Sequence, residues 1–229
     1  MTLRQIAGEE GYEDTLKLSQ YAFQYTLTEE EREKKKRSLA RQQIWAIYDD
    51  QNQLESKLHI LPHKVWIEGQ SIPMGGIAGV ATWPEHRRNG NVATLVKHAL
   101  QQMKEDGYVI SYLHPFKVSF YRKYGWELIA DRHTYELSKD DLVMFPSING
   151  RIKRMDIERE WNILNDTYEA FSAHYNGMLK RDKFWWLHHV NNPGYHFAAA
   201  FGDQDEMIGY LMYKIHFFYQ LHKLIKKDR

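Results

Sequence analysis

The hydrophobic pattern changes period twice between residues 72 and 113, and this change constrains the fold more than any other feature. Residues 72–83 follow a strand pattern that ends at Pro84. An apolar stripe at helical spacing then closes at Gly107, and it consists of Val92, Leu95, Val96, Ala99, Leu100 and Met103. Residues 108–113 return to a strand pattern. A strand, a helix and a strand at this spacing predict a βαβ unit whose two strands lie parallel in one sheet.

The flanking segments predict further helices and antiparallel strands. Residues 12–25 have near-helical apolar spacing, and Thr28 with Glu31 forms a capping box that opens a charged helix. Strand patterns separated by turn signals follow at residues 44–48, 54–61 and 65–67. A short helix is expected over residues 116–124, and a further strand over residues 126–137. Together these patterns predict an α/β fold with a mixed, mostly antiparallel sheet.

The pattern resets at Ser138, where the stretch SKDDLVMFPSINGR has the composition of a linker. We therefore expect one domain over residues 1–145 and a second, incomplete one over residues 146–229. In the second, an amphipathic helix is expected to end near Asn176-Gly177, with Trp161, Leu164, Tyr168 and Phe171 on its apolar face. Residues 195–201 and 207–215 then predict a hairpin. The last residues, HFFYQLHKLIKKDR, fit either a short amphipathic helix or a disordered end.

Composition excludes several classes of function. The chain has no cysteine, so it forms no disulfide and has no thiolate metal site or cysteine nucleophile, which fits a reducing cytoplasm. The formal net charge of +1 draws the chain neither to nucleic acid nor to an anionic membrane. We see no signal peptide and no apolar run of about 20 residues, and we expect a cytoplasmic protein. Among the 12 histidines only His188 and His189 are adjacent, and adjacent side chains point in different directions, so no metal site is expected.

The run from Lys34 to Arg37 is open to two interpretations. It could bind nucleic acid or another partner as a basic helix. It also follows Glu29, Glu30 and Glu31 on the same predicted helix, which favours a solvated face with internal ion pairs. We prefer the second interpretation and expect no nucleic acid partner.

The turn between the predicted strand and helix carries the most chemical information. Arg87-x-x-Gly90 places an arginine beside a helix N-terminus, whose first amides are unpaired and whose dipole is positive. Gly90 lets an anion approach the backbone closely, and Arg87 and Arg88 can donate charge-assisted hydrogen bonds to phosphate oxygens. The residues alone leave open an ordinary strand-to-helix turn with two surface arginines.

This turn resembles motif A of the GNAT family of N-acetyltransferases, [QR]-x-x-G-x-[GA]. It reads Arg87-Arg88-Asn89-Gly90-Asn91-Val92, and it departs from the motif at Val92, where the family has a small residue. The stretch from Phe120 and Tyr121 to Gly125-Trp126 resembles motif B, F-Y-x-x-x-G-[WYF]. With V-A-T-W-P-E-H-R-R-N-G, the chain looks like the enhanced-intracellular-survival (Eis) branch over residues 1 to about 215. Several residues fall where that branch begins its second GNAT-like domain: Arg181, Trp185, Trp186 and Gly209-Tyr210.

The resemblance implies an acyltransferase that moves an acetyl group from acetyl-CoA to a primary amine, on a cationic small molecule or a lysine, in a ternary complex. It implies that the backbone of Val80, Ala81 and Thr82 pairs with the pantetheine arm and polarises the thioester. The implied pyrophosphate cradle consists of Arg88, Asn89, Gly90, Asn91, Val92 and Ala93, with Arg87 in support. Phe116 and Lys117 should border the coenzyme where the parallel strands separate. Tyr121 should be the general acid, the alternative being a core aromatic residue.

The resemblance leaves the general base open. The resemblance implies a longer protein with two GNAT-like domains followed by a sterol-carrier-like domain. In that arrangement the C-terminal carboxylate of the third domain is the general base. The resemblance also implies that the full-length proteins are homo-oligomers. This chain ends at Arg229, within the second part, so we interpret it as truncated. Glu85 and His86 lie next to the coenzyme turn, but the sequence does not place either in an acceptor site. A coenzyme A-binding fragment or regulator with little turnover is therefore the alternative function.

Overall fold

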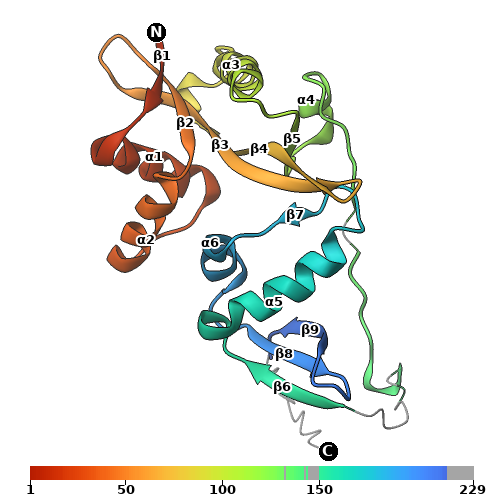
Figure 1. Ribbon diagram of the computed structural model, residues 1–229. Helices are drawn as coiled ribbons and strands as arrows, with labels where there is room; N and C mark the ends of the chain where they lie inside the picture. Colours follow the sequence, from red (N-terminus) through yellow and green to blue (C-terminus); the bar gives the residue numbers. More distant parts are fainter. Residues whose placement is uncertain (132, 142, 144–149, 216–229) are drawn as a thin grey trace, which may run out of the picture. The chain divides into compact units, whose positions relative to one another are not determined.

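The computed structural model describes residues 1–131, 133–141, 143 and 150–215 (Figure 1). The chain divides into two compact units. The first contains Met1–Glu136 and Ala173–Lys180, and the second contains the described residues of Leu137–Ser172 and Arg181–Arg229. Most of the predicted linker core, at residues 144–149, and the predicted tail at residues 216–229 lie outside the described residues.

The first unit contains a six-stranded sheet in the order β1-β2-β3-β4-β5, with β7 also paired to β3 (Figure 1). The strands are β1 (Thr2–Ile6), β2 (Gln43–Tyr48), β3 (Leu54–Ile67), β4 (Gln70–Thr82), β5 (Ile110–Leu113) and β7 (Leu179–Lys180). All neighbours are antiparallel except β4 and β5, which are parallel and joined through a helix. The predicted mixed sheet with one βαβ unit is therefore confirmed.

Helices cover both faces of this sheet, and each face has its own buried cluster. The helices are α1 (Gly8–Phe23), α2 (Glu29–Leu39), α3 (Asn91–Glu105) and the short α4 (Val118–Arg122), with a 3₁₀ turn η1 (Pro84–His86) before α3. Leu16 and Leu18 of α1 and Leu39 of α2 pack on Ile44 and Ala46. On the other face, the apolar stripe of α3 belongs to a second buried cluster. Its α3 members are Leu95, Val96, Ala99 and Met103. Burying a leucine, valine or methionine side chain contributes about 1.5–3 kcal/mol, which fixes α3 on the sheet.

The first two helices follow their sequence signals. Glu31 donates its backbone N–H to the Thr28 hydroxyl (3.3 Å) and accepts the Thr28 N–H on its carboxylate (2.8 Å), so the capping box is confirmed. Within the basic run Lys36 is ion-paired, since it lies 2.9 Å from Glu33 on α2 and 2.6 Å from Glu13 on α1. The predicted ion pairing therefore holds for Lys36, although the contact with α1 was not foreseen.

Two strand predictions were wrong. Residues 54–61 and 65–67 belong to one strand, β3, which continues through Pro62. Pairing with β2 ends at Ile60 and pairing with β7 begins at Lys64, so one edge of β3 is open at Pro62 and tolerates a residue without N–H. The strand predicted over residues 126–137 does not form at its described residues. No described strand pairs with that segment, and most of its apolar residues are exposed: Leu128, Ile129, Tyr135 and Leu137.

The second unit has a three-stranded antiparallel sheet in the order β6-β8-β9. Its elements are η2 (Lys139–Asp141), β6 (Arg151–Met155), α5 (Ile157–Ser172), α6 (Lys183–Trp185), the π-helical turn η3 (Trp186–Val190), β8 (His196–Phe201) and β9 (Met207–Tyr213). The predicted hairpin is confirmed as β8–β9. The helix α5 ends earlier than predicted, at Ser172, because the chain then turns to pair with β3, where Gly177 donates its N–H to the Trp66 carbonyl (2.7 Å). The buried Trp186 ring packs edge-on against Tyr168 and Tyr210.

Throughout the part of the chain that the structure describes, each helix is too short or too polar to cross a bilayer.

Candidate active site

The parallel strands β4 and β5 separate before β4 ends. Their pairing runs from Met74–Ile110 to Ile77–Leu113, whereas β4 continues to Thr82. Beyond Ile77, no described strand pairs with the side of β4 that faces β5. The carboxyl ends of parallel strands lie at the same edge of a sheet, so the segments after both strands meet there. The predicted site residues of both segments are therefore brought to one edge.

A β-bulge interrupts β4 at this edge. Lys57 of β3 pairs with Ala81 and His59 pairs with Ala78, so β4 has one more residue than β3 between these two pairs. Gly79 has φ +58°, and a Cβ at this position would lie 2.8 Å from the His59 ring. A bulge takes backbone groups out of the regular ladder and re-aims them. The bulge thus changes the direction of the backbone in the segment predicted to polarise the thioester, which starts at Val80.

The turn before α3 is open to solvent and has two residues with positive φ, Arg88 at 69° and Gly90 at 82°. Gly90 is the N-cap of α3, and no side chain caps this helix. The exposed Arg87 and Arg88 form no ion pair within the described ranges. Unpaired amides, the positive helix end and two arginines together make a site that favours an anion.

Glu55 ties the start of α3 to β3. Its carboxylate accepts a hydrogen bond from the Asn91 side-chain amide (2.7 Å) and lies 3.4 Å from His86 Nδ1. Asn91 is only 2% exposed, so its side chain points inward and only its backbone can contact a ligand in the turn. Of the two residues considered as a base, Glu85 is exposed and His86 is held by Glu55. Sequence reasoning missed Glu55 because its partners lie more than 30 residues away along the chain.

Tyr121 lies on α4 inside an aromatic group. It is 5% exposed, and its ring centroid lies 5.1 Å from Phe120, 5.6 Å from Phe116 and 6.2 Å from Trp126. Burial raises the pKa of the Tyr121 phenol, so the hydroxyl keeps its proton at neutral pH. Phe116 is 74% exposed and Lys117 is also exposed, just beyond the end of β5. The group therefore combines a buried proton donor with an exposed apolar rim.

His188 and His189 do not approach each other as ligands would. The His188 ring stacks on Phe184 (4.0 Å between centroids) and the His189 ring stacks on Trp185 (4.4 Å). Among the described residues, no group of three or more His, Asp or Glu side chains could hold a metal ion.

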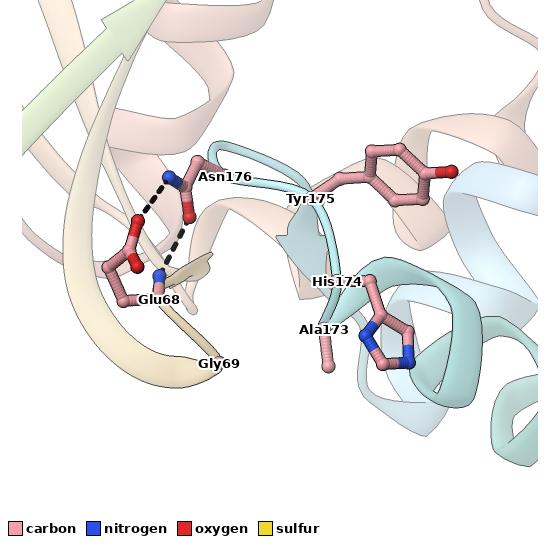
Figure 2. Close-up of a pocket in the computed structure, with 6 residues that line it drawn as sticks. All are labelled: Glu68, Gly69, Ala173, His174, Tyr175 and Asn176. Atoms are coloured by element: carbon pink, nitrogen blue, oxygen red, sulfur yellow. Dashed lines mark hydrogen bonds between the residues drawn. The ribbon is translucent and has the colours of Figure 1, made fainter.

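A shallow hollow of about 400 Å³ lies at the turn that joins β3 to β4, at the end of this hairpin away from the bulge (Figure 2). Glu68 and Asn176 line it and are hydrogen-bonded to each other (Figure 2). The Glu68 N–H donates to Asn176 Oδ1, and the Asn176 side-chain amide donates to the Glu68 carboxylate, each at 2.7 Å. The hollow is far along the hairpin from the bulge and contains none of the predicted site residues. The candidate active site is therefore the edge formed by β4, α3 and α4.

Comparison with known proteins agrees with this fold. Residues 3–129, over half of the 229-residue chain, match the acetyltransferase (GNAT) domain family, and the chain belongs to that family. GNAT enzymes in general use acetyl-CoA and act on an acceptor substrate. No curated protein is significantly similar to the chain.

Solved structures share the fold over nearly the whole chain. A conserved protein of unknown function from Enterococcus faecalis V583, described as a probable N-acyltransferase, is 27% identical with a TM-score of 0.84, and the match covers 94% of this chain and 55% of that one. A GCN5-related N-acetyltransferase from Anabaena variabilis ATCC 29413 is 23% identical with a TM-score of 0.73, covering 92% and 54%. Eis1 from Mycobacterium abscessus is 17% identical with a TM-score of 0.69, covering 86% and 51%. The chain thus spans about half the length of these proteins.

Proposed function

We propose that the chain binds acetyl-CoA along the open edge of β4 and transfers the acetyl group to a primary amine. The acceptor is a cationic small molecule or a lysine side chain, and the amine attacks directly in a ternary complex. The observation that carries this proposal is the early end of the β4–β5 pairing beside an uncapped α3 N-terminus with two unpaired arginines in the described structure. An extended pantetheine arm can add to such an edge as a strand would.

Each part of the edge has a proposed role. The backbone of Val80, Ala81 and Thr82 pairs with the pantetheine arm and stabilises the thioester oxygen as it becomes negative. The backbone amides of the α3 start bind the pyrophosphate, with Arg87 in support, in a cradle made by Arg88, Asn89, Gly90, Asn91, Val92 and Ala93. Phe116 and Lys117 border the coenzyme, a role that their exposure allows. In this cradle Asn91 acts through its backbone, since its side chain binds Glu55.

Tyr121 is the proposed general acid. The amine nitrogen forms a bond to the thioester carbon, the carbon–sulfur bond then breaks, and the phenol gives its proton to the leaving thiolate. The attacking nitrogen releases one proton to solvent water, which leaves a neutral amide, and the Tyr121 phenolate takes one proton back from solvent. The raised pKa of Tyr121 supports this role, because a donor must be protonated when the thiolate forms.

We also propose that the chain is an Eis-branch member with a second GNAT-like domain over residues 146–229. The V-A-T-W-P-E-H-R-R-N-G motif supports the branch. The sheet β6-β8-β9 with α5 against it supports a second α/β unit. Sequence similarity of the second unit to a longer family member, aligned strand by strand, would test this assignment.

The experiment that tests the proposed function is a titration with acetyl-CoA followed by a thiol-release assay. The acceptors are a panel of polyamines and a lysine peptide, and the control omits the amine. Binding with amine-dependent release supports the proposal. Binding without release supports the alternative of a coenzyme A-binding protein with little turnover, and absence of both contradicts the proposal.

A further inference from the structure

A buried lysine reaches the β4 bulge from the neighbouring strand. Lys57 of β3 is 0% exposed and pairs in register with Ala46 and Ala81, which belong to the core cluster under α1 and α2. Residues directly opposite one another in a sheet point to the same face, so Lys57 enters this core. There its Nζ donates a hydrogen bond to the Gly79 carbonyl (2.9 Å). The side chain thus binds the bulge itself.

The same ammonium ends a chain of polar side chains. Lys57 Nζ lies 2.9 Å from His59 Nε2, and His59 Nδ1 lies 2.8 Å from the Gln42 amide oxygen. That oxygen can only accept, so His59 donates from Nδ1 and accepts from Lys57 at Nε2. The Gln42 amide in turn donates to the Ser38 hydroxyl in the last turn of α2 (3.4 Å). Every polar group in the chain from α2 to the bulge therefore has a partner.

Such a lysine is costly for a core. Burial, and to a smaller extent the charge of Lys35 on α2, lowers the pKa of Lys57 to about 7. Burial, then the charge of Lys57, also holds the pKa of His59 well below its usual value, so the ring is neutral. An apolar side chain would fill the same space without this cost. An apolar residue cannot supply the hydrogen bonds to His59 and to Gly79, and of these two the bond to Gly79 holds the bulge backbone.

That contact sets the direction of a neighbouring donor. The peptide group between Gly79 and Val80 is planar and trans, because the described chain has no cis peptide bond. In a trans peptide the carbonyl and the N–H point in opposite directions. With the Gly79 carbonyl bound to Lys57, the Val80 N–H points away from the ammonium. Donation to the carbonyl also polarises the peptide and makes its N–H a stronger donor.

We infer that Lys57 is a positioning residue for acetyl transfer, which holds the Gly79–Val80 peptide so that the Val80 N–H faces the thioester oxygen. This inference rests on the proposed function, since it takes acetyl-CoA to lie along the open edge of β4. His59 assists by packing its ring where a Cβ of residue 79 would lie. Lys57 does not touch the substrate, so its effect is on the rate of chemistry and not on coenzyme affinity.

The first test compares Lys57→Met with Lys64→Met, which changes an exposed lysine of the same strand. We expect Lys57→Met to lower kcat for thiol release by about 10- to 10²-fold, the range seen when an oxyanion donor is misplaced, with coenzyme affinity within about twofold of the parent. Lys64→Met should change neither quantity. An unchanged kcat in a folded Lys57→Met protein, or an equal loss of affinity, would overturn the inference. If the parent itself releases no thiol, it is the proposed function that fails.

The second test needs no substitution and no turnover. The amide shift of Val80 and the Lys57 Nζ resonance are followed by NMR between pH 6 and pH 9, with Val65 amide as the control. The other titratable or charged groups facing Lys57 are His59 on β3, which stays neutral, and Lys35 on α2, whereas its contacts on β2 and β4 are apolar or backbone. We expect the Val80 shift to titrate with the Lys57 midpoint, near pH 7. A flat Val80 shift while Lys57 titrates would overturn the inference.

Discussion

The α3 turn and the β4 bulge are close in sequence and are built in opposite ways. The turn around Arg87 and Gly90 is exposed, and its arginines have no ion pair within the described structure. The bulge at Gly79 is fixed by the ring of His59 and the ammonium of Lys57, both buried and both from another strand. An anion site must keep its donors unpaired for the ligand, whereas a site that orients a reacting bond must be rigid before the ligand arrives. We therefore propose that the turn supplies coenzyme affinity and that the bulge supplies catalytic rate.

The largest expected effect lies in the turn. Gly90→Glu adds a carboxylate where the pyrophosphate should bind, and like charges placed together cost several kcal/mol, so coenzyme affinity should fall by about 10²-fold or more. Gly107→Glu is the matched control. Both glycines have positive φ (82° and 80°), and a Cβ at either meets no atom within 4 Å, but Gly107 lies beyond the other end of α3. Isothermal titration with coenzyme A measures both; equal affinities would place the pyrophosphate elsewhere.

Tyr121→Phe tests whether the Tyr121 hydroxyl contributes to the rate of transfer and not to coenzyme affinity. It removes one hydroxyl from a buried ring and leaves the packing with Phe120 and Trp126 in place. Loss of a general acid lowers kcat by about 10²-fold, and coenzyme affinity should be unchanged. Tyr124→Phe, a half-buried neighbour that also contacts Phe120, should retain full kcat. Steady-state thiol release distinguishes the two variants, and equal kcat values would make Tyr121 a packing residue.

Gly79→Ala tests whether the bulge needs its glycine. A non-glycine residue at positive φ costs about 1–2 kcal/mol, and the new Cβ also meets the His59 ring at 2.8 Å. Gly69→Ala at the opposite end of the hairpin has the same backbone cost, with φ 71° and no atom within 4 Å. Urea unfolding should therefore show a larger loss for Gly79→Ala, with a loss of kcat in that variant alone. Equal losses would mean that His59 does not fix the bulge.

The most gradual effect is the pH dependence of stability. The pKa of Lys57 is about 7 in the folded chain and near 10.5 when the chain is unfolded. Between these values the unfolded chain binds more protons, so the free energy of unfolding rises with pH, by at most about 1.4 kcal/mol per pH unit. Below pH 7 both states bind the proton and this slope disappears. Lys57→Met should flatten the rise measured from pH 7.5 to pH 9.5; an unchanged slope would mean that Lys57 is not buried as a neutral amine.

The comparison also explains which features could be predicted from the sequence. The turn is local, because Arg87, Gly90 and the α3 stripe lie within one βαβ pattern, and periodicity with turn chemistry was sufficient. The strand over residues 126–137 was predicted from the same kind of pattern and failed, since a strand also needs a partner edge. The bulge needs pairing between β3 and β4, and the partners Lys57 and Gly79 are 22 residues apart. No local sequence pattern shows that a lysine inside a strand is buried. The contact between Lys57 and the bulge could therefore be identified only from the three-dimensional structure.

The central claim is that acetyl-CoA lies along the open edge of β4 and over the start of α3. The most direct measurement is amide hydrogen exchange, resolved by residue, with and without saturating acetyl-CoA. Within Val80, Ala81 and Thr82 we predict slower exchange at the amides that point away from β3, and we predict the same in the first turn of α3, since such amides gain hydrogen-bond partners when the coenzyme binds. Slower exchange confined to another region, such as Glu68 and Asn176 at the far hollow, with unchanged exchange along β4, would contradict the claim.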